Sequence, residues 1–133
     1  FGIRSVRGKR YKYIWNFTPE IEFKNACTQT KEFKSWILKA ESGDEDAAEK
    51  VRRYQWRPEI EVYDLNNDPH EWKNLAGRPG IKSVENKLEK VLKDWMKSQG
   101  DKGQQTELAA LERQNRAKKR KKSKGIPKKN KQL

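Results

Sequence analysis

The residues best suited to chemistry lie between Glu61 and Ala76, in the stretch EVYDLNNDPHEWKNLA. This stretch holds the only histidine, His70, close to Asp68 and Glu71. An imidazole beside carboxylates can move protons or bind a metal, but a metal site or a catalytic triad needs several convergent groups. One histidine cannot supply them. We therefore expect His70 to be a surface or boundary residue.

Cys27 is the only cysteine. A single thiol excludes an internal disulfide and a zinc site built from cysteines. We therefore expect Cys27 to be an ordinary small residue. The sequence predicts no catalytic residue and no metal site in this chain. The roles of these polar residues are therefore sought in the strands and helices that contain them.

The stretch around His70 has the pattern of a strand followed by a helix. Residues 59–65 alternate, which predicts a short strand with partial burial on both faces. Asp68 is typical of a helix N-cap, Pro69 of the first helical position, and Glu71 can bond back to the cap amide. The sequence predicts that a helix starts at Asp68, and this needs no chemistry.

Two further strands, at residues 1–6 and 11–17, predict a hairpin. Tyr11, Tyr13, Trp15 and Phe17 share one face of the second strand. This aromatic stripe predicts the packing face of a sheet. The alternative is a platform on which bases or sugars stack.

Helices are predicted between and after the strands. Thr30 can cap a helix that runs to Ala40, and Ser42 with Glu45 forms a capping box for a second one. Residues 31–56 therefore read as a helical insert between strands. The strongest helical pattern covers Ser83–Gly100, with Ser83 as its cap and a left-handed residue at Gly100. A weak helix is predicted from Thr106 to about Lys119.

The net charge of +13 comes from the C-terminal end. Residues 1–112 hold 21 of the 32 basic residues and all 19 acidic ones, a net charge of +2. Residues 113–133 hold the other 11 basic residues and no acid, which is typical of disorder beyond about Arg120. Such a tail can be a solvated segment, can capture a polyanion, or can bind nucleic acid, because each partner presents regularly spaced anions.

Two motifs of this chain resemble motifs of the type I sulfatases, whose fold is related to alkaline phosphatase, and they follow each other in the same order as in that family. Residues 61–76 resemble their C-terminal signature ELYDL-x-x-DP-x-E-x-x-NLA, and GIRSVRGKRYKYIWN at residues 2–16 resembles the R-x-x-R-x-x-RYKYI hairpin before it. The resemblance covers roughly residues 2–100. The DPHE variant is most similar to the heparan N-sulfatase (N-sulfoglucosamine sulfohydrolase) branch.

The resemblance implies a longer enzyme that hydrolyses sulfate esters or sulfamates of sulfated sugars, including N-sulfated glucosamine of heparan sulfate. This family uses Ca²⁺ and a formylglycine made from Cys or Ser in a C/S-x-P-x-R motif. Cys27 is followed by Gln29 where the motif has Pro and by Lys31 where it has Arg. It also lies between C-terminal motifs, whereas the family's nucleophile belongs to the N-terminal half. We therefore expect the cofactors in the rest of the enzyme, none in this chain, and no activity from this chain alone.

The implied partners are a missing N-terminal catalytic domain and a sulfated saccharide. No apolar run is long enough to span a membrane, and we expect no nucleic acid partner. Members of the family are periplasmic, secreted or lysosomal, and the resemblance implies the same here. The candidate substrate-binding residues are Arg52, Arg53 and Arg57, which cluster where the helical insert ends. They form a solvated face or lean toward an anionic substrate.

These observations predict an α+β fold, in which a small antiparallel sheet packs against amphipathic helices. Residues 1–100 are expected to form the sulfatase C-terminal subdomain, residues 101–120 a linker with a weak helix, and residues 121–133 a basic disordered tail. The predicted role is to buttress the catalytic domain and to line the substrate cleft. The competing hypothesis is a small basic module that binds a polyanion or nucleic acid.

Overall fold

The structure is a computed structural model that describes residues 2–110 and 112. It confirms the predicted α+β class. The described residues form three strands, two short 3-10 helices and three α-helices, followed by a helical segment at residues 104–110. In chain order these elements are β1 (Ile3–Arg7), β2 (Tyr11–Asn16), η1 (Cys27–Gln29), α1 (Lys31–Glu41), α2 (Glu45–Gln55), β3 (Ile60–Asp64), η2 (Pro79–Ile81) and α3 (Lys82–Ser98).

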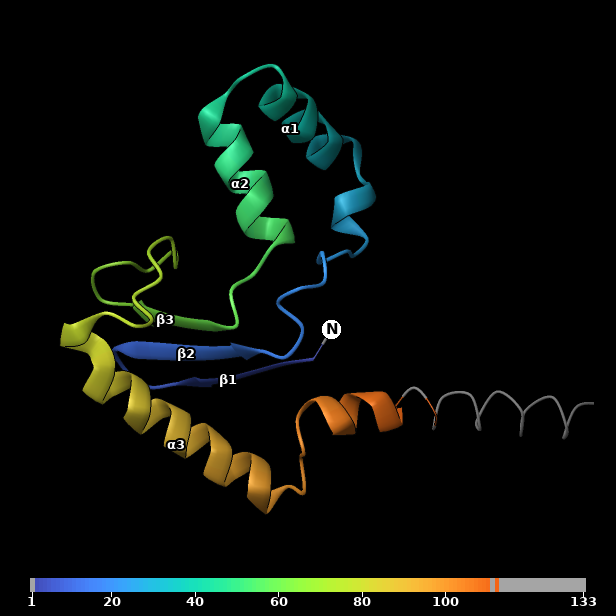
Figure 1. The fold of residues 1–133 in the computed structure, drawn as a ribbon. Coiled ribbons are helices and arrows are strands. Elements are labelled where there is room, and N and C mark those ends of the chain that lie inside the picture. Colours follow the sequence, from blue (N-terminus) through green and yellow to red (C-terminus); the bar gives the residue numbers. More distant parts are fainter. Residues whose placement is uncertain (1, 111, 113–133) are drawn as a thin grey trace, which may run out of the picture.

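The three strands form an antiparallel sheet in the order β1-β2-β3. Helix α3 lies diagonally across one face of this sheet (Figure 1). The core forms in the layer between them and consists of Tyr13, Val62, Leu92 and Met96. Burying a large apolar side chain stabilises a fold by about 1.5–3 kcal/mol, so this layer holds the sheet and α3 together.

The aromatic stripe of β2 faces α3. Tyr13 is only 1% exposed, and Trp15 and Phe17 pack against the core around it. The prediction that the stripe is the packing face of the sheet is therefore confirmed. The alternative, a platform for bases, is wrong for Tyr13, because a buried ring offers no face to a ligand.

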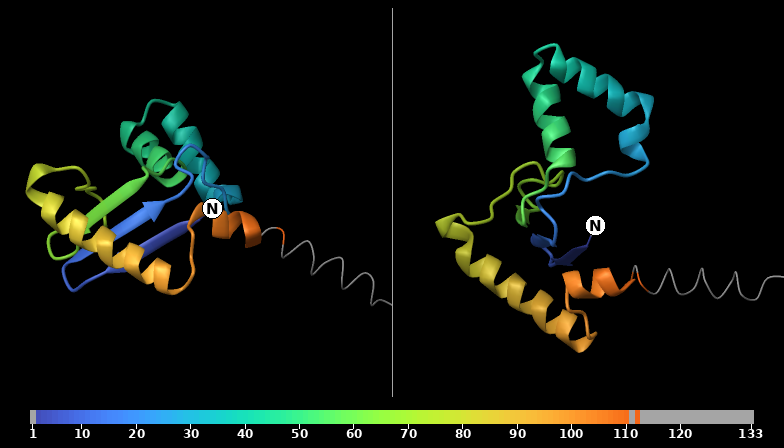
Figure 2. Two further views of the ribbon diagram at one scale, coloured as in Figure 1. Left: turned by 60° about the horizontal axis from the view of Figure 1, so that its bottom comes forward. Right: turned by 45° about the vertical axis from the view of Figure 1, so that its right-hand side comes forward.

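Helices α1 and α2 form a helical hairpin that stands on the other side of the sheet (Figures 1 and 2). Thr30 caps α1 as predicted, since its side chain accepts from the Phe33 N–H at 3.2 Å. The cap of α2 is Asp44, not the predicted Ser42. Ser42 instead ends α1, where its hydroxyl donates to the Lys39 carbonyl. The helices pack mainly on each other.

The predicted helix start at Asp68 is wrong. Residues 65–78, here named the covering loop, form turns without a helix. Glu71 has a φ of 58°, which no α-helix allows. Asn74 instead fastens this loop to β3. Its side chain accepts from the Val62 N–H and donates to the Ile60 carbonyl, so the loop covers the free edge of the sheet.

The last helix differs from its prediction at one end. Helix α3 begins at Lys82, directly after η2, and no side chain caps it, so Ser83 is not the cap. Gly100 takes the expected left-handed conformation, with a φ of 67°. Arg4 of β1 ties the segment that follows to the sheet through ion pairs with Asp101 and Glu107.

The basic tail lies outside the described residues, so its disorder stays a prediction. The predicted weak helix is described over residues 104–110 and at residue 112. In the part of the chain that the structure describes, no helix has the length and apolar character that crossing a membrane requires.

Candidate functional site

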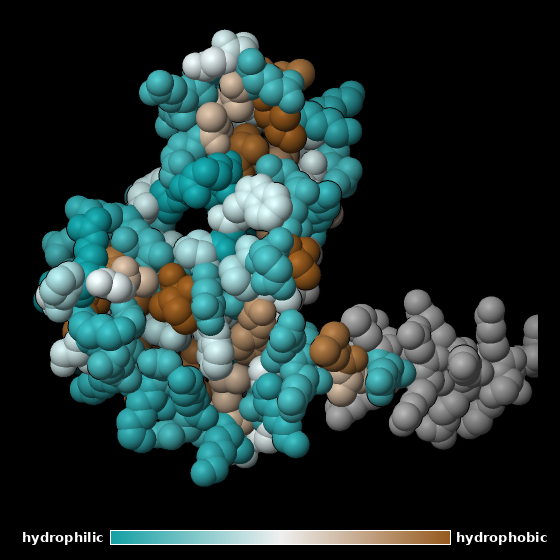
Figure 3. Space-filling model, in the orientation of Figure 1, coloured by the Kyte–Doolittle hydropathy of each residue, from teal (hydrophilic) through white to brown (hydrophobic). Residues whose placement is uncertain are grey.

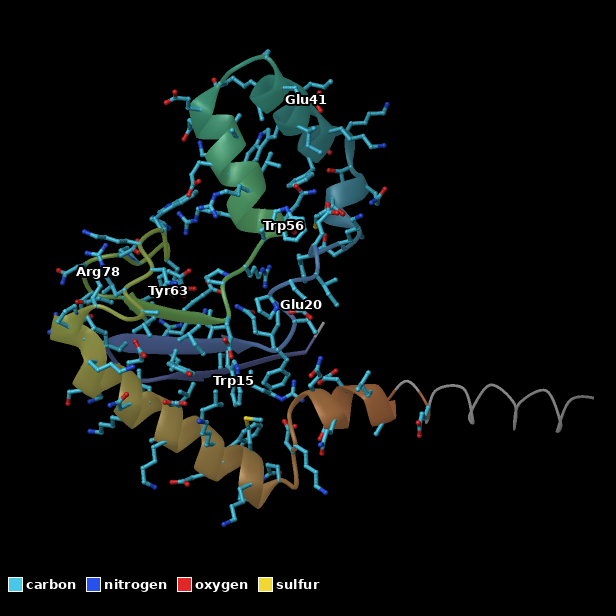
Figure 4. All side chains as sticks on the ribbon, in the orientation of Figure 1. Trp15, Glu20, Glu41, Trp56, Tyr63 and Arg78 are labelled. Carbon is cyan, nitrogen blue, oxygen red and sulfur yellow. The ribbon has the colours of Figure 1, made fainter. Side chains whose placement is uncertain are left out.

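A hollow of about 1040 Å³ lies between the sheet and the helical hairpin, on the face of the sheet opposite α3. Lys12 and Ile14 of β2 reach it because they alternate with the residues that face the core. The hairpin supplies one wall and the covering loop another. Figure 3 shows the hollow as an opening between the two parts of the molecule, and Figure 4 places Tyr63 and Trp56 beside it.

All three predicted arginines, Arg52, Arg53 and Arg57, line this hollow. Arg52 is already engaged, because its guanidinium donates to both carboxylate oxygens of Glu49 at 2.8 and 2.7 Å. This pair holds the pKa of Glu49 below its usual value. Arg52 is thus a poor candidate for a ligand contact, and the other two arginines carry the site.

Arg53 and Arg57 are held by aromatic rings. The Arg53 guanidinium lies 4.9 Å from the ring centroid of Trp72 and donates to the Glu71 carbonyl at 2.9 Å. The Arg57 guanidinium lies 4.0 Å from the ring centroid of Phe23. Among the described residues neither arginine forms an ion pair with an acid. Neither guanidinium is therefore neutralised by direct contact with a carboxylate, although Arg53 contacts Tyr63 and interacts electrostatically with Glu49 and Asp68.

The acids that reach the floor of the hollow are bonded to neighbours. Lys12 donates to both carboxylate oxygens of Glu71 at 2.9 and 2.8 Å. Asn16 donates to Glu61 at 2.7 Å, and the Tyr63 hydroxyl donates to the other oxygen of Glu61. Glu71 is thus neutralised by Lys12, whereas Glu61 keeps its charge among neutral donors. The described lining holds five Lys and Arg side chains and three Glu side chains. This balance favours an anionic ligand.

The hollow has few groups for catalysis. Burial first, and then the hydrogen bond to Glu61, raises the pKa of Tyr63 above its usual value, so the phenol stays neutral at pH 7. His70 lines the hollow with an exposed side chain, as expected for a surface residue, and Cys27 is exposed in η1, away from it. No Ser, Thr or Cys is found among the described residues that line it.

A metal ion has no matching ligand set here. Within residues 2–110 and 112, no group of three or more His, Cys, Asp or Glu side chains is placed to hold one. Asp64 illustrates why: Arg10 donates to it at 2.7 Å and holds its pKa down at about 2, and Asn67 also donates to it.

Sequence reasoning missed the tryptophans. Trp36, Trp56 and Trp72 line the hollow and are 46%, 46% and 54% exposed. On α1 it is Phe33 that is buried, while Trp36 stays half-exposed. The signal was the count of five Trp in a chain whose core has room for few of them. Large rings left half-exposed around a hollow are typical of a binding surface.

The fold and the hollow define a small α+β unit with a cationic, tryptophan-lined hollow and, in its described part, no metal cluster. No known family profile matches the chain. It is 40% identical over 101 residues to an ulvan-active sulfatase of Formosa agariphila, which covers 76% of this chain and 18% of that protein. A second ulvan-active sulfatase of this organism is 35% identical over 109 residues, covering 74% of this chain and 17% of that protein.

These similarities support a sulfatase region, as the two sequence motifs implied. The α+β fold with its three-stranded sheet fits a sulfatase C-terminal subdomain. The chain spans less than a fifth of the length of the curated relatives it matches. Neither relative carries the name heparan N-sulfatase, so the predicted closeness to that branch has no support from them.

Proposed function

We propose that this chain is the C-terminal subdomain of a sulfatase that hydrolyses sulfate esters or sulfamates of sulfated sugars. In this proposal the subdomain buttresses the catalytic domain, and its hollow lines one side of the substrate cleft. The observation that carries the proposal is the 40% identity to an ulvan-active sulfatase. Arg53 and Arg57, which have no ion-pair partner among the described residues, agree with a substrate that carries sulfate groups.

The reactive groups belong to the rest of the enzyme in this proposal. A formylglycine and Ca²⁺ supply the nucleophile and the charge stabilisation in the family that the motifs resemble. The described residues contribute positive charge, apolar ring faces and a rigid sheet. An exported location, in the periplasm, outside the cell or in a lysosome, is proposed on the same basis.

The test compares sulfate release by the full-length protein that contains this chain with release by the 133-residue chain alone. Ulvan, an aryl sulfate and an N-sulfated glucosamine saccharide are assayed side by side. We expect release by the full-length protein and none by the chain. Turnover by the chain above buffer, or no release from any substrate by the full-length protein, contradicts the proposal. The preferred substrate then decides between ester and sulfamate hydrolysis.

The role of the hollow is tested by Arg57→Gln in the full-length protein. Its matched control is Arg78→Gln, because Arg78 is exposed and lies outside the hollow. If the hollow binds substrate before and during the reaction alike, Arg57→Gln raises KM and leaves kcat unchanged. Equal KM values for the two variants contradict a place for the hollow in the substrate cleft.

A further inference from the structure

We infer that the hollow holds a sulfated saccharide chain of several sugar units rather than a single sulfated sugar. Trp36, Trp56 and Trp72 would pack against sugar rings, and Arg53 and Arg57 would each hold a sulfate group. This inference rests on the proposed function, because it names the kind of substrate that the hollow takes.

The size of the hollow is the first argument. Its volume of about 1040 Å³ slightly exceeds the range of about 300–1,000 Å³ that is usual for pockets that enclose drug-sized ligands. A single sugar ring would leave most of this space to water. The opening seen in Figure 3 also lets a chain run through the hollow instead of ending in it.

The second argument is that the tryptophans come from separate elements. Trp36 belongs to α1, Trp56 follows α2, and Trp72 lies on the covering loop. The hairpin and the loop form different walls of the hollow, so the rings of Trp36 and Trp72 belong to different walls. Sugar rings have apolar faces of C–H groups that pack on such side chains. Several rings on several walls suit successive sugar units.

The third argument is the state of the two guanidinium groups. Arg53 donates to the Glu71 carbonyl, also contacts the Tyr63 side chain and rests on Trp72, and Arg57 rests on Phe23. Guanidinium has five N–H donors in a planar fork, so donors remain for a bidentate contact with a sulfate. The aromatic supports fix the planes of both groups before a ligand arrives. Two such groups match a ligand that carries more than one sulfate.

The experiment measures binding of saccharides to the 133-residue chain by titration calorimetry at constant ionic strength. The probes are ulvan-derived oligosaccharides of two and of six sugar units, the desulfated six-unit oligosaccharide, inorganic sulfate, and a single-stranded oligonucleotide. We expect the sulfated six-unit probe to bind about tenfold or more tightly than the two-unit probe, because it reaches ring and sulfate contacts on both walls. Every variant keeps residues 113–133, so nonspecific attraction to that basic segment is common to all.

Matched variants separate the hollow from the rest of the surface. Trp72→Ala is compared with Trp95→Ala, since Trp95 is 53% exposed on α3, outside the hollow. Arg57→Gln is compared with Arg78→Gln. We expect Trp72→Ala and Arg57→Gln each to weaken binding of the six-unit probe by roughly tenfold, and the controls to weaken it less than about twofold. Circular dichroism of each variant checks that the fold is kept.

Equal affinity for the two-unit and six-unit probes overturns the inference, and so does an equal loss in the hollow and control variants. Tighter binding of the oligonucleotide than of the sulfated six-unit probe overturns it in favour of nucleic acid. The proposed function fails separately. If the chain binds as expected but the full-length protein releases no sulfate, the subsite stands without the sulfatase activity. If the full-length protein releases sulfate but Trp72→Ala binds the six-unit probe as tightly as the wild type, the sulfatase activity stands and the proposed subsite is wrong.

Discussion

The sharpest prediction from the fold concerns Asn74, which fastens the covering loop to β3 where the sequence had predicted a helix. Its Oδ1 accepts from the backbone N–H groups of Val62 at 2.9 Å and Ala76 at 3.0 Å. Its Nδ2 donates to the carbonyl of Ile60 at 3.0 Å. The change Asn74→Ala removes all three bonds at once and leaves the edge of β3 without these partners.

The expected loss follows from these bonds. A hydrogen bond within a protein contributes about 0.5–1.5 kcal/mol net, so three of them give about 2–4 kcal/mol. Small domains are stable by only about 5–15 kcal/mol, so this is a large share of the total. At about 4–8 °C per kcal/mol, the melting temperature falls by roughly 8–32 °C.

The assay is urea unfolding followed by tryptophan fluorescence, which reports on the tryptophans around the sheet. Asn66→Ala is the matched control, because Asn66 lies on the same loop with an exposed side chain that makes no hydrogen bond in the described part of the chain. The control should change the free energy of unfolding by less than about 0.5 kcal/mol. Equal losses in the two variants would refute the conclusion that the Asn74 side chain fastens the loop.

Three further predictions follow from other parts of the fold. The pKa of Asp64 is lowered to about 2 by Arg10. Because this folded-state pKa lies below the unfolded one, the pair stabilises the fold above about pH 4 and the contribution disappears as the pH falls toward 2. In a series of thermal melts at different pH values, Arg10→Gln should reduce the fall in melting temperature between about pH 4 and pH 2. An unchanged fall counts against the role of this ion pair. Leu92→Ala should cost about 2–5 kcal/mol in urea unfolding, whereas the exposed neighbour Val91→Ala should cost less than about 1 kcal/mol; similar values would place the core elsewhere. Glu71→Gly should be nearly neutral in melting temperature, because glycine relieves the left-handed backbone while the ion pair with Lys12 is lost, but Glu71→Val should lower it clearly.

The elements predicted correctly are those whose pattern reports directly on burial. The alternation in β2 placed Tyr13 against the core. The helical pattern over Ser83–Gly100 predicted α3, of which Leu92 and Met96 reach the same layer while Val91 and Trp95 stay exposed. The start of a helix at Asp68 failed for a different reason. The Asp68 side chain does accept backbone N–H groups, at Trp72 and Lys73, which is what a cap does. An Asp that accepts backbone N–H groups a few residues later is found both in turns and at helix starts. Here the hydrogen bonds of Asn74 to β3 favour the turn.

The candidate site could be predicted only in part. The sequence places Arg52, Arg53 and Arg57 together because they lie on one helix end. It does not tell which of them is neutralised, since that depends on the rotamer that joins Arg52 to Glu49. Nor can it bring Trp36 to the same hollow as residues of the covering loop, because the angle between hairpin and sheet sets that distance. Long-range geometry of this kind is absent from local periodicity.

One face of the sheet forms the core, and the opposite face forms the floor of the hollow. Because side chains alternate along β2, Tyr13 and Trp15 reach the core on the α3 side while Lys12 and Ile14 reach the hollow. Changes at exposed residues of the hollow, such as Trp36 and Trp72, therefore leave the buried layer intact, whereas changes at Asn74 do not. A ligand that contacts both the hairpin and the covering loop would join two walls that Arg53 already bridges, and at 100 times its Kd it would add about 2.7 kcal/mol to stability.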